Sequence, residues 1–301
     1  MTLVTSSPGV QREGAMDVSF MDLDGARAAF RKVGAGPPLL LIHGWPLHGL
    51  TFRGLLPALS SRYTCYVVDL PGAGESEWSD RMDLSAHGHA RWLERFLHAA
   101  GVGRVSLLAF DNGGTAARLL AVSLGARVEA LVLSNTEMPG HRPPWVPLYK
   151  RLLGMPGATA TFRALLRLRA FRRSRLGYGG CFVDRSLIDG EFHQLFVAPL
   201  LEQPRALEGQ LRILDALQWS VLDQMADLHG RIAAPVKLIW GADDVTFPLD
   251  HARRMRFPRQ EDLAEIRGGA LLVHEEKPAE YLAAALPFLD RCRGQGGAAQ
   301  P

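Results

Sequence analysis

Short apolar runs alternate with longer helical patterns along most of this 301-residue chain, and this alternation restricts the folds open to it. Most of the runs are apolar at consecutive positions, which is typical of parallel strands buried on both faces. A β-α-β succession produces a mostly parallel sheet with helices on both faces. We therefore expect an α/β fold with eight strands, near residues 17–23, 26–33, 38–44, 63–70, 104–110, 128–134, 235–241 and 262–268.

One long interval breaks this rhythm. From about residue 137 to 230 the sequence has helical patterns and no convincing buried strand. Such an insertion between two parallel strands predicts a helical cap over the carboxyl edge of the sheet, the edge where open α/β sheets bind ligands. We expect a core domain of residues 15–136 and 231–293 and a cap subdomain of residues 137–230. The core helices are expected near 50–60, 84–100, 113–125, 249–257 and 278–291.

The stretch SLLAFDNGGTAARLL, residues 106–120, places a carboxylate between a buried strand and a helix. Small residues flank Asp111 at the spacing of the G-x-S-x-G elbow of serine hydrolases, with Asp111 in the nucleophile's place. A carboxylate can attack an sp³ carbon that bears a leaving group, such as a halide or an epoxide oxygen, and form a covalent ester. Because aspartate is also favoured at helix N-caps, a purely helix-capping Asp111 is the alternative.

Three further segments resemble motifs of the α/β-hydrolase superfamily. HGWPLHGLTFR, residues 43–53, has the H-G-x-P-(x)6-R spacing of haloalkane dehalogenases and the tryptophan common among epoxide hydrolases. DLPGAGESE, residues 69–77, resembles the D-x-x-G-x-G-x-S loop, and LVLSNTEMPG, residues 131–140, resembles the strand that leads into the cap. The resemblance spans about residues 38–290 and implies an α/β-hydrolase fold in the haloalkane dehalogenase and epoxide hydrolase group.

This resemblance implies roles for four residues. The residue after HG and the residue after the nucleophile, here Trp45 and Asn112, supply backbone N–H donors to developing negative charge, and their side chains help to hold a halide in dehalogenases. Dehalogenases usually carry tryptophan at the second position; Asn112 departs from that pattern but keeps an amide donor. The G-x-x-D-x-x-x-P pattern in residues 239–250 implies Asp244 as the acid, with a solvated turn or a helix cap as the alternative. Glu137 is the other candidate acid, because some dehalogenases carry the acid there.

The catalytic histidine that the resemblance implies after the last strand is absent. In RGGALLVHEEKPAEYL, residues 267–282, the HEEKP segment aligns the catalytic position with Leu271. His274 lies three residues later, where relatives carry a histidine without a catalytic role; a loop rearrangement that brings His274 to Asp111 is the alternative. Because that histidine activates the water that cleaves the ester, its loss slows hydrolysis by roughly 10²- to 10⁴-fold.

The predicted cap supplies the candidate residues of the substrate pocket. Epoxide hydrolases use two cap tyrosines to protonate the epoxide oxygen, and the tyrosines in this interval are Tyr149 and Tyr178. Trp145 and Trp219 are candidates for pocket walls or halide contacts, with core positions as the alternative. Leu271 is expected to border the same pocket.

Composition narrows the classes of partner. The net charge is only +3, so composition alone does not indicate nucleic-acid binding. Nine basic residues and no acidic ones lie between Glu137 and Asp184, which predicts a solvated basic cap face; an anionic substrate or a membrane surface is the alternative. No apolar run approaches a membrane span, and residues 1–14 lack the pattern of a signal peptide, so we expect no stable membrane insertion.

Three cysteines, odd in number and without CxxC spacing, argue against a disulfide framework or a zinc site. We therefore expect a cytoplasmic monomer or homodimer that needs neither metal nor cofactor and binds a small-molecule substrate. Three functions stay open: a dehalogenase- or epoxide hydrolase-like enzyme with impaired hydrolysis, a biosynthetic isomerase, cyclase or lyase that uses Asp111 as an acid or base, and a catalytically inactive binding protein.

Overall fold

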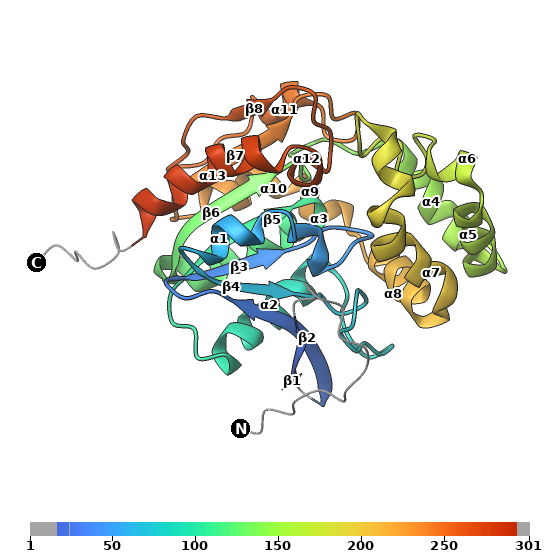
Figure 1. Ribbon diagram of the computed structural model, residues 1–301, viewed down its shortest axis with the longest axis horizontal. Helices are drawn as coiled ribbons and strands as arrows, with labels where there is room; N and C mark the ends of the chain where they lie inside the picture. The colour runs from blue at the N-terminus through green and yellow to red at the C-terminus, as the bar shows by residue number, and fades with distance from the viewer. Residues whose placement is uncertain (1–16, 24, 294–301) are drawn as a thin grey trace, which may run out of the picture.

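The computed structural model describes residues 17–23 and 25–293; the expectations for residues 1–14 and for the first two residues of the core domain lie outside this part of the chain. Its eight strands form one sheet in the order β1-β2-β4-β3-β5-β6-β7-β8 (Figure 1). Strand β2 pairs antiparallel with β1 and β4, and the other neighbours are parallel. The strands are β1 Ser19–Leu23, β2 Ala26–Val33, β3 Pro38–Ile42, β4 Thr64–Val68, β5 Val105–Phe110, β6 Val128–Ser134, β7 Val236–Gly241 and β8 Ala264–Ile266. All eight predicted strands are present, and the predicted α/β fold is confirmed.

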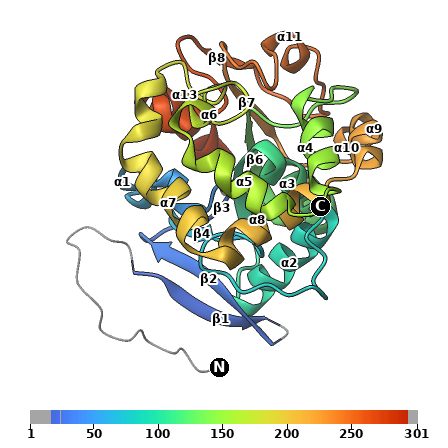
Figure 2. The same ribbon diagram turned by 90° about the vertical axis from the view of Figure 1, so that its right-hand side faces the viewer.

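The centre of the sheet is the hydrophobic core. Every residue of β5 is buried, as is the run Leu39–Ile42 of β3, because helices cover both faces. Helices α1 and α13 lie on one side and α2 and α3 on the other (Figures 1 and 2). Burial on both faces explains why these strands are apolar at consecutive positions. The helices outside the β6–β7 interval are α1 Leu56–Ser60, α2 Ala86–Ala99, α3 Asp111–Leu124, α11 Leu249–Ala252, α12 Val273–Glu276 and α13 Pro278–Cys292.

Two of the predicted helices are shorter than the sequence pattern indicated. The pattern over 50–60 is a 3₁₀ turn, Gly49–Phe52, followed by α1, because a proline in the first turn of α1 starts a new helix. The pattern over 249–257 ends as a helix at Ala252. Met255 and Phe257 are both buried although they are two positions apart, a spacing that one helix face does not provide.

The described chain between β6 and β7 contains helices and no strand. Helices α4 to α8 lie beyond the carboxyl ends of the central strands, whereas α9 and α10 pack on α3 through Leu222, Met225 and Leu228 (Figures 1 and 2). None of the helices in residues 17–23 and 25–293 is both long and apolar enough to cross a bilayer. The helices of this interval are α4 Trp145–Leu153, α5 Ala158–Arg167, α6 Arg169–Arg172, α7 Ala198–Glu202, α8 Pro204–Asp215, α9 Trp219–Asp223 and α10 Met225–Gly230.

Candidate active site

Asp111 occupies a sharp bend between strand β5 and helix α3. Phe110 is extended, and Asp111 has a φ of +51°, a left-handed conformation that few residues other than glycine adopt. The Asp111 N–H donates to the Asn135 carbonyl at 3.0 Å, and the Thr136 hydroxyl donates to the Asp111 carbonyl at 2.6 Å. Strain held in place in this way is frequent at active sites. Because Phe110 is the N-cap of α3, the helix-capping alternative for Asp111 does not hold.

Two glycines allow this bend to form. A Cβ atom on Gly113 would lie 2.1 Å from the carbonyl oxygen of His43. A Cβ atom on Gly44 would lie 2.4 Å from the Cβ atom of Asp111. Both positions therefore require the absence of a side chain, which brings the β3 loop against the start of α3.

Backbone donors hold the Asp111 carboxylate. The Trp45 N–H donates to Oδ2 of Asp111 at 2.8 Å, and the Asn112 N–H also bonds this carboxylate. The structure thus brings both predicted backbone donors to Asp111. These bonds favour the charged form, but burial and the nearby Glu137 carboxylate outweigh them and raise the pKa of Asp111 well above its usual value. Asp111 is still partly exposed, because it borders a cavity.

Both candidate acids lie near Asp111. Glu137 is buried, lines the same cavity and accepts a 2.9 Å hydrogen bond from the Thr115 hydroxyl. Asp244 is also buried and accepts from Asn135 Nδ2 at 2.7 Å. Burial raises the pKa of Asp244 to about 7 and also raises the pKa of Glu137. Three carboxyl groups thus share one weakly hydrated region, and the solvated-turn alternative for Asp244 does not hold.

No histidine is among the described residues that line the cavity, and Leu271 occupies its wall. His274 is buried elsewhere: its Nε2 is 2.8 Å from the Thr51 hydroxyl, and its ring packs 4.3 Å from that of Phe110. Burial lowers the pKa of His274 to about 3, so the ring is neutral. The structure therefore does not bring His274 to Asp111, and the rearrangement that would have made His274 a substitute base is not present.

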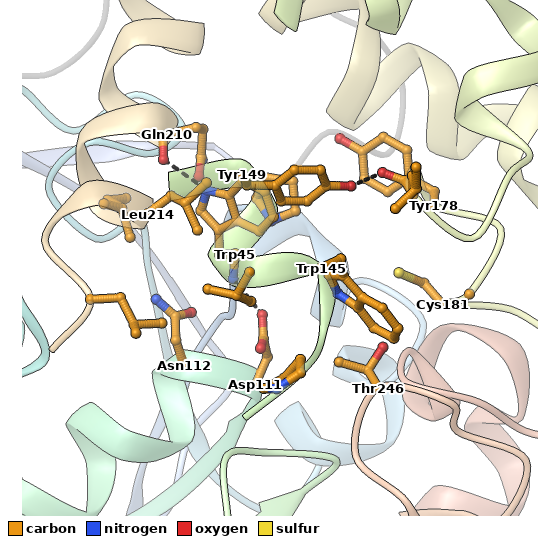
Figure 3. Close-up of a pocket in the computed structure, with 18 of the residues that line it drawn as sticks. Trp45, Asp111, Asn112, Trp145, Tyr149, Tyr178, Cys181, Gln210, Leu214 and Thr246 are labelled. Atoms are coloured by element: carbon orange, nitrogen blue, oxygen red, sulfur yellow. Dashed lines mark hydrogen bonds between the residues drawn. The ribbon is translucent and has the colours of Figure 1, made fainter. Parts of the chain in front are cut away.

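The cavity beside Asp111 has a volume of about 140 Å³ and a largely apolar wall (Figure 3). A cavity of about this size accommodates a benzene-sized ligand. The four aromatic residues predicted for the pocket all line it: Trp145, Tyr149, Tyr178 and Trp219. The wall also includes Phe162, Cys181, Gln210 and Thr246, which the sequence motifs did not assign to the pocket.

The polar tips of the aromatic side chains differ in their hydrogen bonds. The Trp45 indole N–H donates to the Gln210 carbonyl at 2.7 Å, which ties the β3 loop to α8 (Figure 3). Because the Trp45 indole N–H already donates this hydrogen bond, it is not available in this structure for the expected halide contact. The Tyr149 hydroxyl donates to the Leu176 carbonyl. The Tyr178 hydroxyl is buried and has no partner among the described residues.

The basic residues of the α4–α6 region do not form one uniform solvated face. Arg172 is buried and donates to the Leu166 and Arg167 carbonyls at 2.8 and 2.9 Å. Arg169 and Arg173 both bond Asp189. Arg175 is exposed and contributes to the cavity wall. Part of the basic pattern therefore serves internal packing.

Comparison with known proteins agrees with this arrangement. Residues 37–277 match the family described as alpha/beta hydrolase fold. A magnesium-chelatase 30 kDa subunit of Rhodobacter capsulatus is 32% identical over 243 residues, 80% of this chain and 82% of that protein. Haloalkane dehalogenase 2 of Mycobacterium tuberculosis (strain ATCC 25618 / H37Rv) is 26% identical over 277 residues, 89% of this chain and 93% of that protein.

A solved structure, epoxide hydrolase CorEH without ligand, is similar in fold, with a TM-score of 0.77 at 21% identity over 92% of this chain and 99% of that chain. The sequence of this chain matches one family over most of its length. The structure of the same chain has the sheet order, the bend at Asp111 and the helices inserted after β6 that are described above. This protein belongs to the alpha/beta hydrolase fold family.

Proposed function

We propose that this protein is a cofactor-independent enzyme in which Asp111 attacks an sp³ carbon of a small or medium apolar electrophile, an epoxide or an alkyl halide. The observation that carries the proposal is the 2.8 Å hydrogen bond from the Trp45 N–H to Asp111 Oδ2. It holds the carboxyl group of Asp111 at the wall of the cavity that would receive the substrate. Backbone donors in this position also stabilise the negative charge that develops when the resulting ester is attacked.

The surroundings of Asp111 support this choice of substrate. The largely apolar cavity wall favours an uncharged, hydrophobic ligand. Within the proposed cap of residues 137–230, helices α4 to α8 cover the site and keep water from it, and the core carries Asp111 and Asp244 (Figure 1). The relatives named haloalkane dehalogenase and epoxide hydrolase act, by their names, on the two kinds of electrophile that a carboxylate attacks.

Hydrolysis of the ester is the weak step. Leu271 stands where the resemblance implies the base, and a leucine cannot take a proton from water. Loss of a positioned base slows such a step by roughly 10²- to 10⁴-fold. We therefore expect the ester on Asp111 to form faster than it is cleaved.

A second candidate function has its own supporting observation. Burial and Glu137 raise the pKa of Asp111 well above its usual value, which favours the protonated form of this carboxyl group. A protonated carboxyl in an apolar pocket is a general acid, suited to an isomerase, cyclase or lyase. In that case Asp111 exchanges protons with the substrate and forms no covalent bond.

Intact-mass spectrometry separates these possibilities. The protein is incubated with styrene oxide or 1-bromohexane, quenched in acid and weighed. We expect a mass increase of one electrophile, located on the Asp111 peptide and missing in Asp111→Asn, whose side chain has the same shape but is a poor nucleophile. Absence of any adduct and of any consumption of both probes would contradict the covalent function.

A further inference from the structure

A small chamber with a mixed polar and apolar wall adjoins the main cavity. Its volume is about 30 Å³, above the roughly 10–15 Å³ that one water molecule needs. Asn112 and Glu137 line both the chamber and the main cavity, and the wall of the main cavity also includes Asp111. Ser85, Thr115 and Gln218 add further polar groups to its wall.

Asn112 presents an unsatisfied acceptor in this region. Its side-chain Oδ1 is shielded from bulk solvent and has no hydrogen-bond donor among the described residues. A buried amide oxygen left without a donor costs about 1–3 kcal/mol, so such atoms are normally paired with protein or with ordered water. A water bound here would satisfy Oδ1 and would point its oxygen atom at neighbouring groups.

Glu137 is held rigidly on the same wall. Its Oε2 accepts from the Thr115 hydroxyl at 2.9 Å and, more weakly, from the Thr136 hydroxyl at 3.4 Å. Its backbone carbonyl accepts from Arg118 at 3.1 Å. Burial lowers the pKa of Arg118 only to about 10, so this guanidinium keeps its charge at neutral pH and favours the ionised form of Glu137.

We propose that Glu137 replaces the missing histidine as the base that activates a water held between its carboxylate and Asn112 Oδ1. This inference rests on the proposed function, in which a substrate ester forms on Asp111. The water oxygen attacks Asp111 Cγ while one water proton passes to Glu137, and the negative charge develops against the Trp45 and Asn112 N–H groups. The bond from Cγ to the substrate oxygen then breaks, and that oxygen takes the proton from Glu137 and leaves as an alcohol. Asp111 is regenerated with an oxygen atom from water.

The charges of the two carboxyl groups suit this order of events. An ionised Asp111 opposes the ionisation of Glu137, because like charges in a buried site raise one another's pKa. Ester formation makes Asp111 neutral and removes this repulsion. Ester formation therefore removes one factor that opposes the ionisation of Glu137 at the stage when a base is required.

The test is a single-turnover experiment with styrene oxide in H₂¹⁸O, comparing the wild type with Glu137→Gln. In the variant we expect the Asp111 ester to form within about tenfold of the wild-type rate and to decay roughly 10²-fold or more slowly. Asn112→Leu, which removes the second contact of the water but keeps the backbone N–H, is expected to slow decay by about tenfold. The matched surface variant Glu280→Gln, exposed on α13, is expected to behave as the wild type. Wild-type protein should carry ¹⁸O in the Asp111 peptide after turnover.

Each other outcome overturns a defined part of the scheme. Equal decay rates in the wild type and Glu137→Gln would overturn the role of Glu137 and leave the ester chemistry standing. If Glu137→Gln fails to fold, an unchanged decay rate in Asn112→Leu would overturn the proposed water site. Absence of an ester on Asp111 in all variants would instead overturn the proposed function, and the role of Glu137 with it.

Discussion

The backbone N–H of Trp45 lies 2.8 Å from Oδ2 of Asp111 and donates a hydrogen bond to it. The indole N–H of the same tryptophan donates to the Gln210 carbonyl at 2.7 Å. Trp45 thus connects the reacting carboxyl group to α8, a helix that lies over the cavity (Figure 3). The position of α8 and the position of the backbone donor are therefore coupled.

Trp45→Phe keeps the backbone donor and removes the indole N–H. We expect it to lower the free energy of unfolding by about 1 kcal/mol and to speed amide exchange in α8, because the tie between loop and helix is lost. Urea titration and hydrogen exchange measure the two effects. Trp219→Phe is the control, since the Trp219 indole N–H donates a hydrogen bond to none of the other described residues. Equal effects of both variants on exchange in α8 would contradict the coupling.

Leu271→His restores an imidazole at the cavity wall. We expect faster decay of the Asp111 ester, by up to roughly 10²- to 10⁴-fold, with the largest gain in the Glu137→Gln background. Leu271→Gln supplies a polar group without a base and should give little gain. Single-turnover decay rates decide the matter. A correctly folded Leu271→His protein with no gain would show that position 271 is not the place of the lost base.

The rate of ester formation should depend on pH because only the carboxylate attacks carbon. Burial and the neighbouring Glu137 raise the pKa of Asp111 well above its usual value. The carboxylate fraction, and with it the rate, therefore increases with pH through a range where an exposed aspartate is already fully ionised. Glu137→Gln removes a like charge and should move the midpoint to lower pH. Adduct formation measured from pH 5 to 9 tests this; a flat wild-type profile would contradict the raised pKa.

The two tyrosines of the cavity wall should respond differently to loss of the hydroxyl group. The Tyr178 hydroxyl is buried without a partner, so Tyr178→Phe should leave the free energy of unfolding unchanged or higher. Tyr149→Phe removes the hydrogen bond to the Leu176 carbonyl and should lower the free energy of unfolding by about 1 kcal/mol. If the Tyr178 hydroxyl protonates an epoxide, Tyr178→Phe slows reaction with styrene oxide but not with 1-bromohexane. Equal slowing of both probes would assign Tyr178 a packing role.

The fold was predictable because its strands are buried on both faces. Continuous apolar runs such as that of β5, separated by helical patterns, indicate parallel strands that are buried on both faces. The bend at Asp111 was also predictable, since the glycine two residues later marks the close approach of the β3 loop. Helix ends were less predictable: the segment after Ala252 leaves the helix to bury Met255 and Phe257, which depends on tertiary packing.

Aromatic residues of the cavity wall were predicted from the sequence, whereas the small chamber and the backbone contacts around the cavity were not. The Trp45 indole N–H donates to the backbone carbonyl of Gln210. Every residue has a backbone carbonyl, so the identity of residue 210 does not predict this contact. His274, which was expected to have no catalytic role, turns into the core against Thr51. The unpaired Oδ1 of Asn112 is a property of three-dimensional packing, so the chamber beside it became visible only in the structure.

A crystal structure of the wild-type protein after reaction with styrene oxide is the most direct measurement. We expect continuous electron density from a carboxylate oxygen of Asp111 to a substrate carbon, with the other oxygen still bonded to the Trp45 N–H and no imidazole within hydrogen-bond distance of Asp111. Density for an intact ligand in the cavity without a bond to Asp111, or for an ester on a different residue, would contradict the covalent role of Asp111.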